Sequence, residues 1–185
     1  MDIACWGHNR GLPVKAYSSG GRYGLNDAGQ TPNTQATTFT YGDGSIMTFE
    51  VRNLGSFQEF DGGNCGNSFY GTKGFYVREK GFFTYKEGKM TEREAIPVPT
   101  DAAKLELGNK WQRFFKAVRS RNPADMPVST EAGHLSCVHC HLGNIAYRLG
   151  HSLEFDPKTE RFKDREANQY LKREYRKGFE VPQLA

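Results

Sequence analysis

The order of the periodic patterns along the chain most constrains how it can fold. Residues 34–41 and 45–52 alternate between two faces, and the Gly42-Asp43-Gly44 between them is typical of a hairpin turn. Aromatic-rich runs within 68–96, joined by short turns, extend this pattern to about six strands. Helical spacing of apolar residues follows at 108–121, 130–149 and 165–176. Strands followed by helices predict an α+β fold: an open, mostly antiparallel sheet of about six or more strands, with helices packed on one face.

The segment 130–149 is the clearest helix of the sequence. Ser129 or Thr130 can cap its start, and Gly150 can end it. At ~100° per residue, its apolar side chains fall within an arc of roughly 100°. These side chains are Leu135, Val138, Leu142, Ile145, Ala146 and Leu149. Such a stripe is enough to fix the helix against a sheet.

Residues 137–141 of this helix read Cys-Val-His-Cys-His, which matches the attachment signature of a c-type haem. Haem attachment needs both thiols at one porphyrin edge while the histidine binds iron. The motif lies inside an amphipathic helix, and the sequence has neither an evident second axial segment nor an export signal. We therefore interpret the match as coincidental.

A helical wheel places His134, Cys137 and His141 together on one flank of the apolar stripe. They are candidate catalytic residues of a stand-alone hydrolase or lyase, in which Cys137 and His141 would form a nucleophile pair. A zinc ion would also need a fourth ligand. The remaining candidates for it are Cys65, His8 and His151. The alternative is that the three residues simply pack beside the core, and no metal site is predicted.

Several function classes find no support in the sequence. It contains no glycine-rich nucleotide-binding motif, no Walker A motif and no nucleophile elbow. No stretch approaches the ~20 apolar residues of a membrane span, and the first residues do not read as a signal peptide. The most basic segment, 158–177, mixes both signs of charge. We expect a cytoplasmic protein, with neither a membrane nor nucleic acid as a partner.

Particular segments, in their order and spacing, link the chain to a known family. They are Met1–Gly7, Thr31–Glu50, Phe69–Gly74, His139–Leu149 and Phe155–Phe162. Together they resemble the C-terminal domain of the glucose–fructose oxidoreductase, inositol dehydrogenase and rhizopine-catabolism (Gfo/Idh/MocA) family, over the whole chain. Residues 1–185 are accordingly predicted to be one domain of this kind, with no nucleotide-binding domain. Cys137 departs from the family pattern, whereas Cys140-His141-Leu142 fits it.

The resemblance implies that cofactor binding and catalysis belong to a domain other than the one this chain resembles. In this family a Rossmann domain binds NAD(P) and carries a Glu-Lys-Pro element whose lysine serves catalysis. An Asp-x-x-x-His element comes immediately before the segment that matches Met1–Gly7. The chain is therefore expected to lack the catalytic Lys, Asp and His, to bind no cofactor alone and not to be redox-competent alone.

The resemblance also suggests ligands and partners. In the family, loops such as residues 20–34 line the sugar pocket, which makes Arg22, Tyr23, Asn33 and Gln35 candidate substrate-binding residues for a carbohydrate. The sheet face would form a homodimer. Three hypotheses follow: a substrate-side and oligomerisation domain of a sugar or polyol NAD(P)-dependent oxidoreductase, a hydrolase or lyase using the 130–149 helix, and a non-catalytic homodimeric interaction module.

Overall fold

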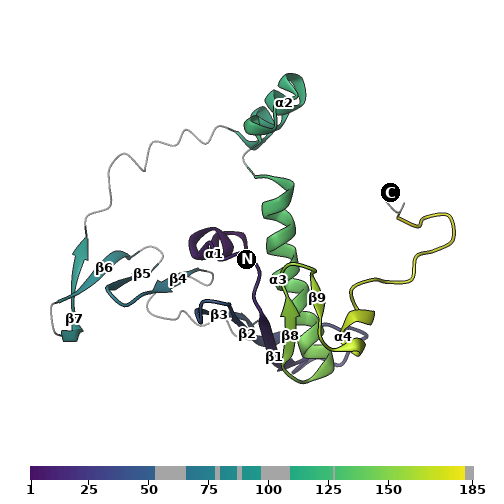
Figure 1. The fold of residues 1–185 in the computed structure, drawn as a ribbon, viewed down its shortest axis with the longest axis horizontal. Helices are drawn as coiled ribbons and strands as arrows, with labels where there is room; N and C mark the ends of the chain where they lie inside the picture. Colours follow the sequence, from purple (N-terminus) through teal and green to yellow (C-terminus); the bar gives the residue numbers. More distant parts are fainter. Residues whose placement is uncertain (53–65, 78–79, 87–88, 97–108, 127, 182–185) are drawn as a thin grey trace. The chain divides into compact units, whose positions relative to one another are not determined.

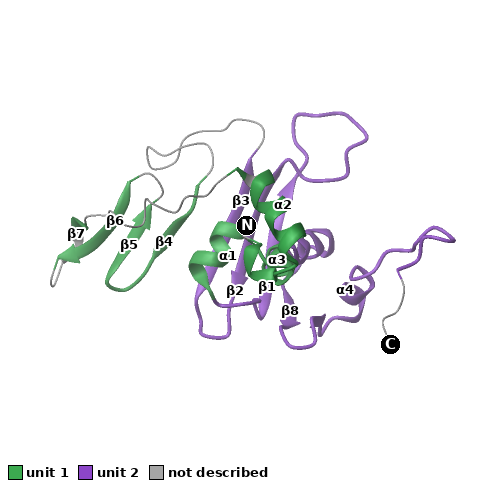
Figure 2. Cartoon of the chain, turned by 90° about the horizontal axis from the view of Figure 1, so that it is seen from above, with its two compact units in different colours: residues 1–9, 56–136 green, residues 10–55, 137–185 purple. Residues whose placement is uncertain are grey.

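The computed structural model describes residues 1–52, 66–77, 80–86, 89–96, 109–126 and 128–181. The chain forms two compact units (Figure 2). The first unit comprises residues 1–9 and 56–136, and the second comprises residues 10–55 and 137–185. None of the helices in the described ranges has the length and hydropathy needed to cross a membrane.

The second unit is built on a five-stranded antiparallel sheet with the order β3-β2-β1-β8-β9 (Figure 1). Its strands are β1 (Lys15–Gly21), β2 (Thr34–Thr40), β3 (Ile46–Arg52), β8 (Leu153–Asp156) and β9 (Arg161–Phe162). The predicted hairpin is the β2–β3 connection. Asp43 Oδ1 accepts from Ser45 N at 3.0 Å, and Gly44 has the positive φ of 82° that such a turn favours.

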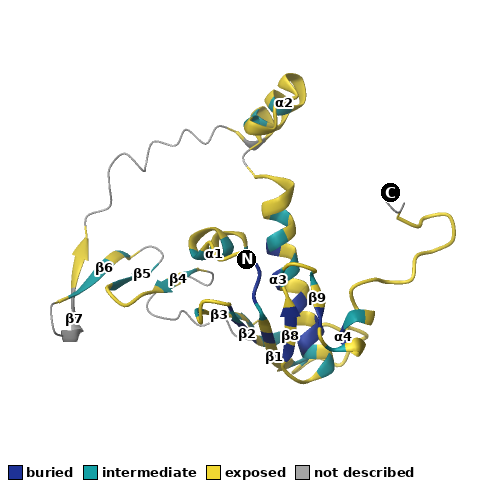
Figure 3. Ribbon diagram, viewed as in Figure 1, coloured by how far each residue is buried: buried dark blue, intermediate teal, exposed yellow. Residues whose placement is uncertain are grey.

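The core of the second unit lies between this sheet and the last three turns of α3 (Thr130–Leu149). Leu142, Ile145 and Ala146 of the predicted stripe are buried. The other three stripe residues, Leu135, Val138 and Leu149, are half-buried. The strands of the second unit contribute further buried residues, which are Ala16, Phe39, Leu153, Phe155 and Phe162. Figure 3 shows the buried positions gathered on β8, β9 and the adjoining turns of α3.

The first unit contains a four-stranded antiparallel sheet with the order β4-β5-β6-β7. Its strands are β4 (Ser68–Tyr70), β5 (Gly74–Val77), β6 (Gly81–Lys86) and β7 (Lys89–Ile96). Stacked rings run across it, with centroids 5.9 Å apart for Tyr70 and Phe75 and 4.9 Å apart for Phe75 and Phe83. The unit also holds α1 (Asp2–His8), α2 (Lys110–Ser120) and the short 3₁₀ helix η2 (Pro123–Asp125).

The predicted α+β class and its antiparallel pairing are confirmed, with the described strands divided between two sheets. The predicted helix 165–176 is wrong beyond its first turns, because α4 covers only Arg165–Gln169. Asp164 caps α4 by accepting from Glu166 N at 2.8 Å. Ala167 is the one buried residue of this helix, and residues 171–177 are all exposed. Without an apolar face to bury, a continuing helix gains too little from packing to persist.

Candidate functional site

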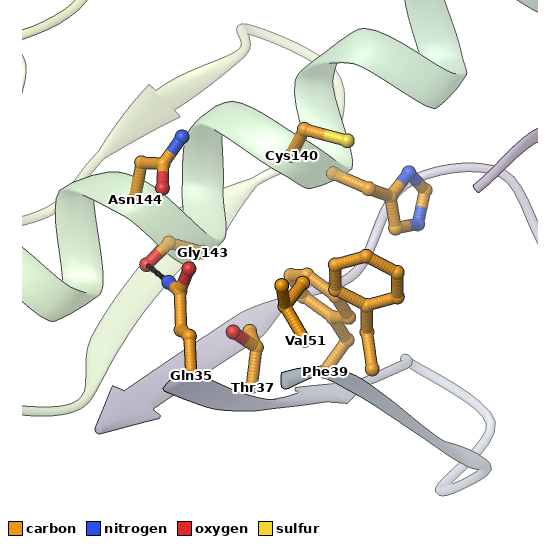
Figure 4. A pocket seen from close by; sticks show the side chains of 9 residues that line it. Gln35, Thr37, Phe39, Val51, Cys140, Gly143 and Asn144 are labelled. Carbon is orange, nitrogen blue, oxygen red and sulfur yellow. Dashed lines mark hydrogen bonds between the residues drawn. The ribbon is translucent and has the colours of Figure 1, made fainter. Parts of the chain in front are cut away.

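A pocket of about 190 Å³ lies in the second unit, between strands β2 and β3 and one side of α3 (Figure 4). Its strand residues are Gln35, Thr37, Phe39, Phe49 and Val51, and its helix residues are His139, Cys140, Gly143 and Asn144. The lining is mixed: amide and hydroxyl groups lie at one end and aromatic or aliphatic groups at the other. All of these residues belong to one compact unit.

Gln35 is held by its amide nitrogen. Its Nε2 donates to Ser18 Oγ at 2.9 Å and to the carbonyl oxygen of Gly143 at 3.3 Å. Its Oε1 accepts no hydrogen bond from the described residues. Because no buried side-chain oxygen or nitrogen in those residues is without a partner, Oε1 must be accessible to solvent. The side chain therefore presents a fixed, accessible acceptor.

The polar end of the pocket depends on a close approach of the helix to the sheet. A Cβ atom at Gly143 would lie 3.1 Å from Thr37 Cγ2 and 3.2 Å from Thr37 Oγ1. Since only glycine leaves this space open, the helix backbone comes near enough for Gln35 to reach it. Thr37 Oγ1 itself is engaged with Ser18 Oγ at 2.8 Å.

The inner wall contains a buried polar pair that the sequence interpretation missed. His139 is 0% exposed, and its Nε2 lies 2.8 Å from Tyr41 Oη. Its ring meets Phe39 edge to face, with centroids 5.2 Å apart. Residue 139 lies three positions before Leu142 and seven before Ala146, so helical spacing alone would have placed it on the buried face. A histidine among the apolar positions of the helix was therefore a sequence signal for a buried polar residue.

Asn144 and Cys140 form the outer rim and are exposed. Figure 4 shows Asn144 on the same side of the pocket as Gln35, and Cys140 one turn earlier along α3. The Asn144 amide makes no hydrogen bond to the described residues. The rim thus adds an available donor and acceptor to the fixed oxygen of Gln35.

Of the four predicted substrate-binding residues, Gln35 alone lines this pocket. Asn33 is buried and closes its own loop: its Oδ1 accepts from Tyr23 N at 3.0 Å, and its Nδ2 donates to Tyr23 O at 2.7 Å. Arg22 pairs with Asp27 through Nε to Oδ1 at 2.7 Å and Nη2 to Oδ2 at 2.5 Å. The structure therefore gives Arg22 and Asn33 loop-closing contacts.

The Arg22–Asp27 pair makes a prediction for the pH response of this loop. Hydrogen bonds from Arg22, then from Gly29 N, lower the Asp27 pKa to about 2. Because this pKa is lowered, the ionised Asp27 stabilises the loop. This stabilisation is complete at pH values above the ordinary pKa of aspartate, and it is lost as the pH falls through about 2. We expect the Gly29 amide resonance to be unchanged from pH 7 to 4 in an NMR titration. In Arg22→Gln, the midpoint of the Gly29 titration should rise toward the ordinary pKa of aspartate. An unchanged midpoint in that variant would contradict the Arg22–Asp27 pairing.

The second set of predicted residues does not line the pocket. His134, Cys137 and His141 are exposed on α3, with His134 in the first unit and the other two in the second. In the part of the chain that the structure describes, no three or more His, Cys, Asp or Glu side chains group to hold a metal. Of the suggested fourth ligands, His8 is half-buried in α1, His151 lies 3.5 Å from Asp164 Oδ2, and Cys65 is outside the described residues.

Comparisons with known proteins agree with the fold. A solved structure of a proposed oxidoreductase from Thermotoga maritima aligns with a TM-score of 0.56 at 15% identity, over 82% of this chain. The chain spans only 43% of that protein's length, and at this identity the likeness concerns the fold alone. No curated protein sequence matches the chain. Residues 78–181 match the C-terminal alpha/beta domain of an oxidoreductase family. The chain therefore belongs to the Gfo/Idh/MocA oxidoreductase family, whose C-terminal domain it contains.

Proposed function

We propose that this chain is the substrate-side part of a sugar or polyol NAD(P)-dependent oxidoreductase, and that the pocket beside α3 holds a polyhydroxylated ring. The observation that carries the proposal is the Gln35 amide, anchored through its nitrogen with its oxygen turned to solvent. A hydroxyl group can donate to this oxygen, and a second hydroxyl can bond the Asn144 amide on the rim. Membership of the oxidoreductase family supports the assignment.

The size and lining of the pocket suit a small ring. A cavity of roughly 150 Å³ can hold benzene, so the volume of about 190 Å³ is sufficient for a six-membered ring. Pockets for larger ligands typically run from about 300 to 1,000 Å³. Phe39, Phe49 and Val51 offer an apolar wall to the C–H face of a sugar, while the amides serve its hydroxyl edge.

Hydride transfer needs a nicotinamide cofactor beside the substrate. The sequence carries no dinucleotide-binding motif, so we assign cofactor binding and the proton-transferring residues to a nucleotide-binding domain. The chain alone should bind a polyol without oxidising it. A measurable rate of NAD⁺ reduction with myo-inositol by the isolated chain would contradict this division.

Ligand binding can be tested by NMR titration with myo-inositol and glucose, following the backbone amides of Gly143 and Asn144. Losing one hydrogen bond should weaken binding about 3–10-fold, and we expect this for Asn144→Ala, which changes an exposed side chain. Gln35→Leu should weaken binding further, because it removes the fixed oxygen and the anchor to Gly143. Gln169→Leu is the matched control, since it makes the same change on another surface of the second unit.

Two results would contradict the pocket assignment. One is the absence of shifts at Gly143 and Asn144 across the whole polyol titration. The other is equal affinity in wild type, Asn144→Ala and Gln35→Leu. Shifts confined to residues 159–172 would place the ligand elsewhere in the same unit.

We also propose a homodimer through the four-stranded sheet of the first unit. Its stacked row of Tyr70, Phe75 and Phe83 offers flat aromatic surface, and Tyr70 is 62% exposed. A two-fold contact of such a row with its own copy is self-complementary. Sedimentation should report a dimer that Tyr70→Lys weakens, whereas a strict monomer at high concentration would contradict the proposal. Cys137 and Cys140 are exposed and form no disulfide, which suits a reducing compartment and supports a cytoplasmic location.

A further inference from the structure

A chain of hydrogen bonds along the polar end of the pocket begins at the Gln35 amide. The carbonyl oxygen of Gly143 can only accept, so the atom that meets it at 3.3 Å is the amide nitrogen of Gln35. The same nitrogen lies 2.9 Å from Ser18 Oγ. Because an amide nitrogen donates and does not accept, Ser18 Oγ is the acceptor of this bond. The hydroxyl proton of Ser18 is therefore still available for a bond of its own.

Two oxygen atoms compete for the Ser18 proton. Thr37 Oγ1 is 2.8 Å from Ser18 Oγ, and the carbonyl oxygen of Ala36 is 3.3 Å from it. Bonds from a hydroxyl to an oxygen are normally about 2.5–3.0 Å long, so the contact with Thr37 alone has an ordinary length. We therefore infer that Ser18 donates to Thr37 Oγ1. The Thr37 hydroxyl accepts this bond and keeps its own proton.

The Thr37 proton has no acceptor in the described part of the chain, because the Ser18 contact is the one hydrogen bond that this side chain makes there. Thr37 is 2% exposed and lines the pocket beside Gln35. Figure 4 shows both side chains rising from β2 toward α3. A buried donor without an acceptor is unfavourable. An acceptor atom inside the pocket would remove this penalty.

We propose that Thr37 is a specificity-determining residue of the polyol pocket, where it donates its proton to a ligand oxygen while Gln35 Oε1 accepts from a ligand hydroxyl. This inference rests on the proposed function. The two groups are neighbours, because Gln35 Nε2 and Thr37 Oγ1 both contact the same Ser18 oxygen. They complement two hydroxyls of one ring, of which the first must donate and the second must accept. A carbonyl oxygen, which only accepts, fits opposite Thr37 and not opposite Gln35.

Analogues of myo-inositol with hydrogen or fluorine in place of one hydroxyl separate the two directions. Carbon-bound fluorine accepts a hydrogen bond weakly and cannot donate one. At the carbon opposite Gln35, both analogues should bind about 3–10-fold more weakly than myo-inositol. At the carbon opposite Thr37, the fluoro analogue should bind more tightly than the deoxy analogue. NMR titration of the Gly143 and Asn144 amides measures each affinity.

Substitutions at position 37 test whether this residue causes the difference. Thr37→Val keeps the shape of the side chain without its hydroxyl, and it should lower the affinity for myo-inositol by about 3–10-fold. In this variant the fluoro and deoxy analogues should bind equally at the carbon opposite residue 37, and Thr37→Ser should restore the difference. Thr38→Val is the matched control, because the next residue of β2 points to the other face of the sheet and does not line the pocket.

Two results would overturn the inference and leave the polyol pocket in place. One is equal binding of the fluoro and deoxy analogues at every carbon in the wild-type chain, a result that does not depend on how any variant folds. The other is an affinity of Thr37→Val for myo-inositol that equals the wild-type affinity. A wild-type chain that binds none of these polyols would instead remove the proposed function, and this inference with it.

Discussion

Phe39→Ala is expected to lower the free energy of unfolding of the second unit by about 3–5 kcal/mol. Phe39 is 1% exposed, lies in the inner strand β2 and packs edge to face on His139. Its removal leaves a cavity between the sheet and α3 that the surrounding backbone can fill only in part. The same change enlarges the pocket, so polyol binding should weaken as well.

Urea unfolding followed by far-ultraviolet circular dichroism and by NMR of α3 amides can measure this loss. Both tryptophans, Trp6 and Trp111, lie in the first unit, so their fluorescence reports on that unit alone. Ile46→Ala is the matched control, because Ile46 is 64% exposed in the adjacent strand β3 and should cost about 0.5 kcal/mol or less. Equal effects of the two substitutions would contradict the packing described for β2 and α3.

His139→Leu is expected to cost about 2–3 kcal/mol, because it leaves the buried Tyr41 hydroxyl without its 2.8 Å partner. Tyr41 Oη also donates to Met47 Sδ at 3.8 Å, and sulfur is a weak acceptor. Tyr41→Phe in the His139→Leu background removes the hydroxyl that has lost the histidine. The loss of unfolding free energy in the double variant should therefore be smaller than the sum of the losses in the two single variants.

A double-mutant cycle tests this pair directly. We expect a coupling free energy between residues 41 and 139 of about 1–2 kcal/mol. Strictly additive losses would mean that the 2.8 Å contact contributes nothing to stability. Pairing Tyr41→Phe with Ile46→Ala supplies a control cycle, in which the expected coupling is near zero.

The sequence predicted those elements that depend on residues close together in the chain. The hairpin between β2 and β3 follows from Asp43 and Gly44, and the buried side of α3 follows from the spacing of Leu142, Ile145 and Ala146. Overlooking His139 on the same face was an error of interpretation, because the helical spacing already contained that information. The overlong helix at 165–176 arose from charged residues with good helix propensity but no apolar face to bury.

The site itself depends on contacts that sequence spacing does not encode. Gln35 and the Gly143 carbonyl are 108 positions apart, and they meet because β2 and α3 pack together. Gln35 was predicted as a ligand residue from its place after a polar loop. Arg22 and Asn33 were predicted on the same basis, but their side chains bond within the loop. Only the three-dimensional structure distinguishes a polar group that closes a loop from one that faces a cavity.

Gly143 sets one dimension of the pocket, which is the distance between α3 and strand β2. Because its missing Cβ sets how near α3 comes to Thr37, each added carbon at this position would change the spacing of the whole wall while every hydrogen-bonding group keeps its identity. In the proposed polyol pocket, we therefore expect different residues to control the size and the polarity of the ligand. A small library at position 143 would be a direct route to altered ring-size selectivity, with Gln35 and Asn144 left intact.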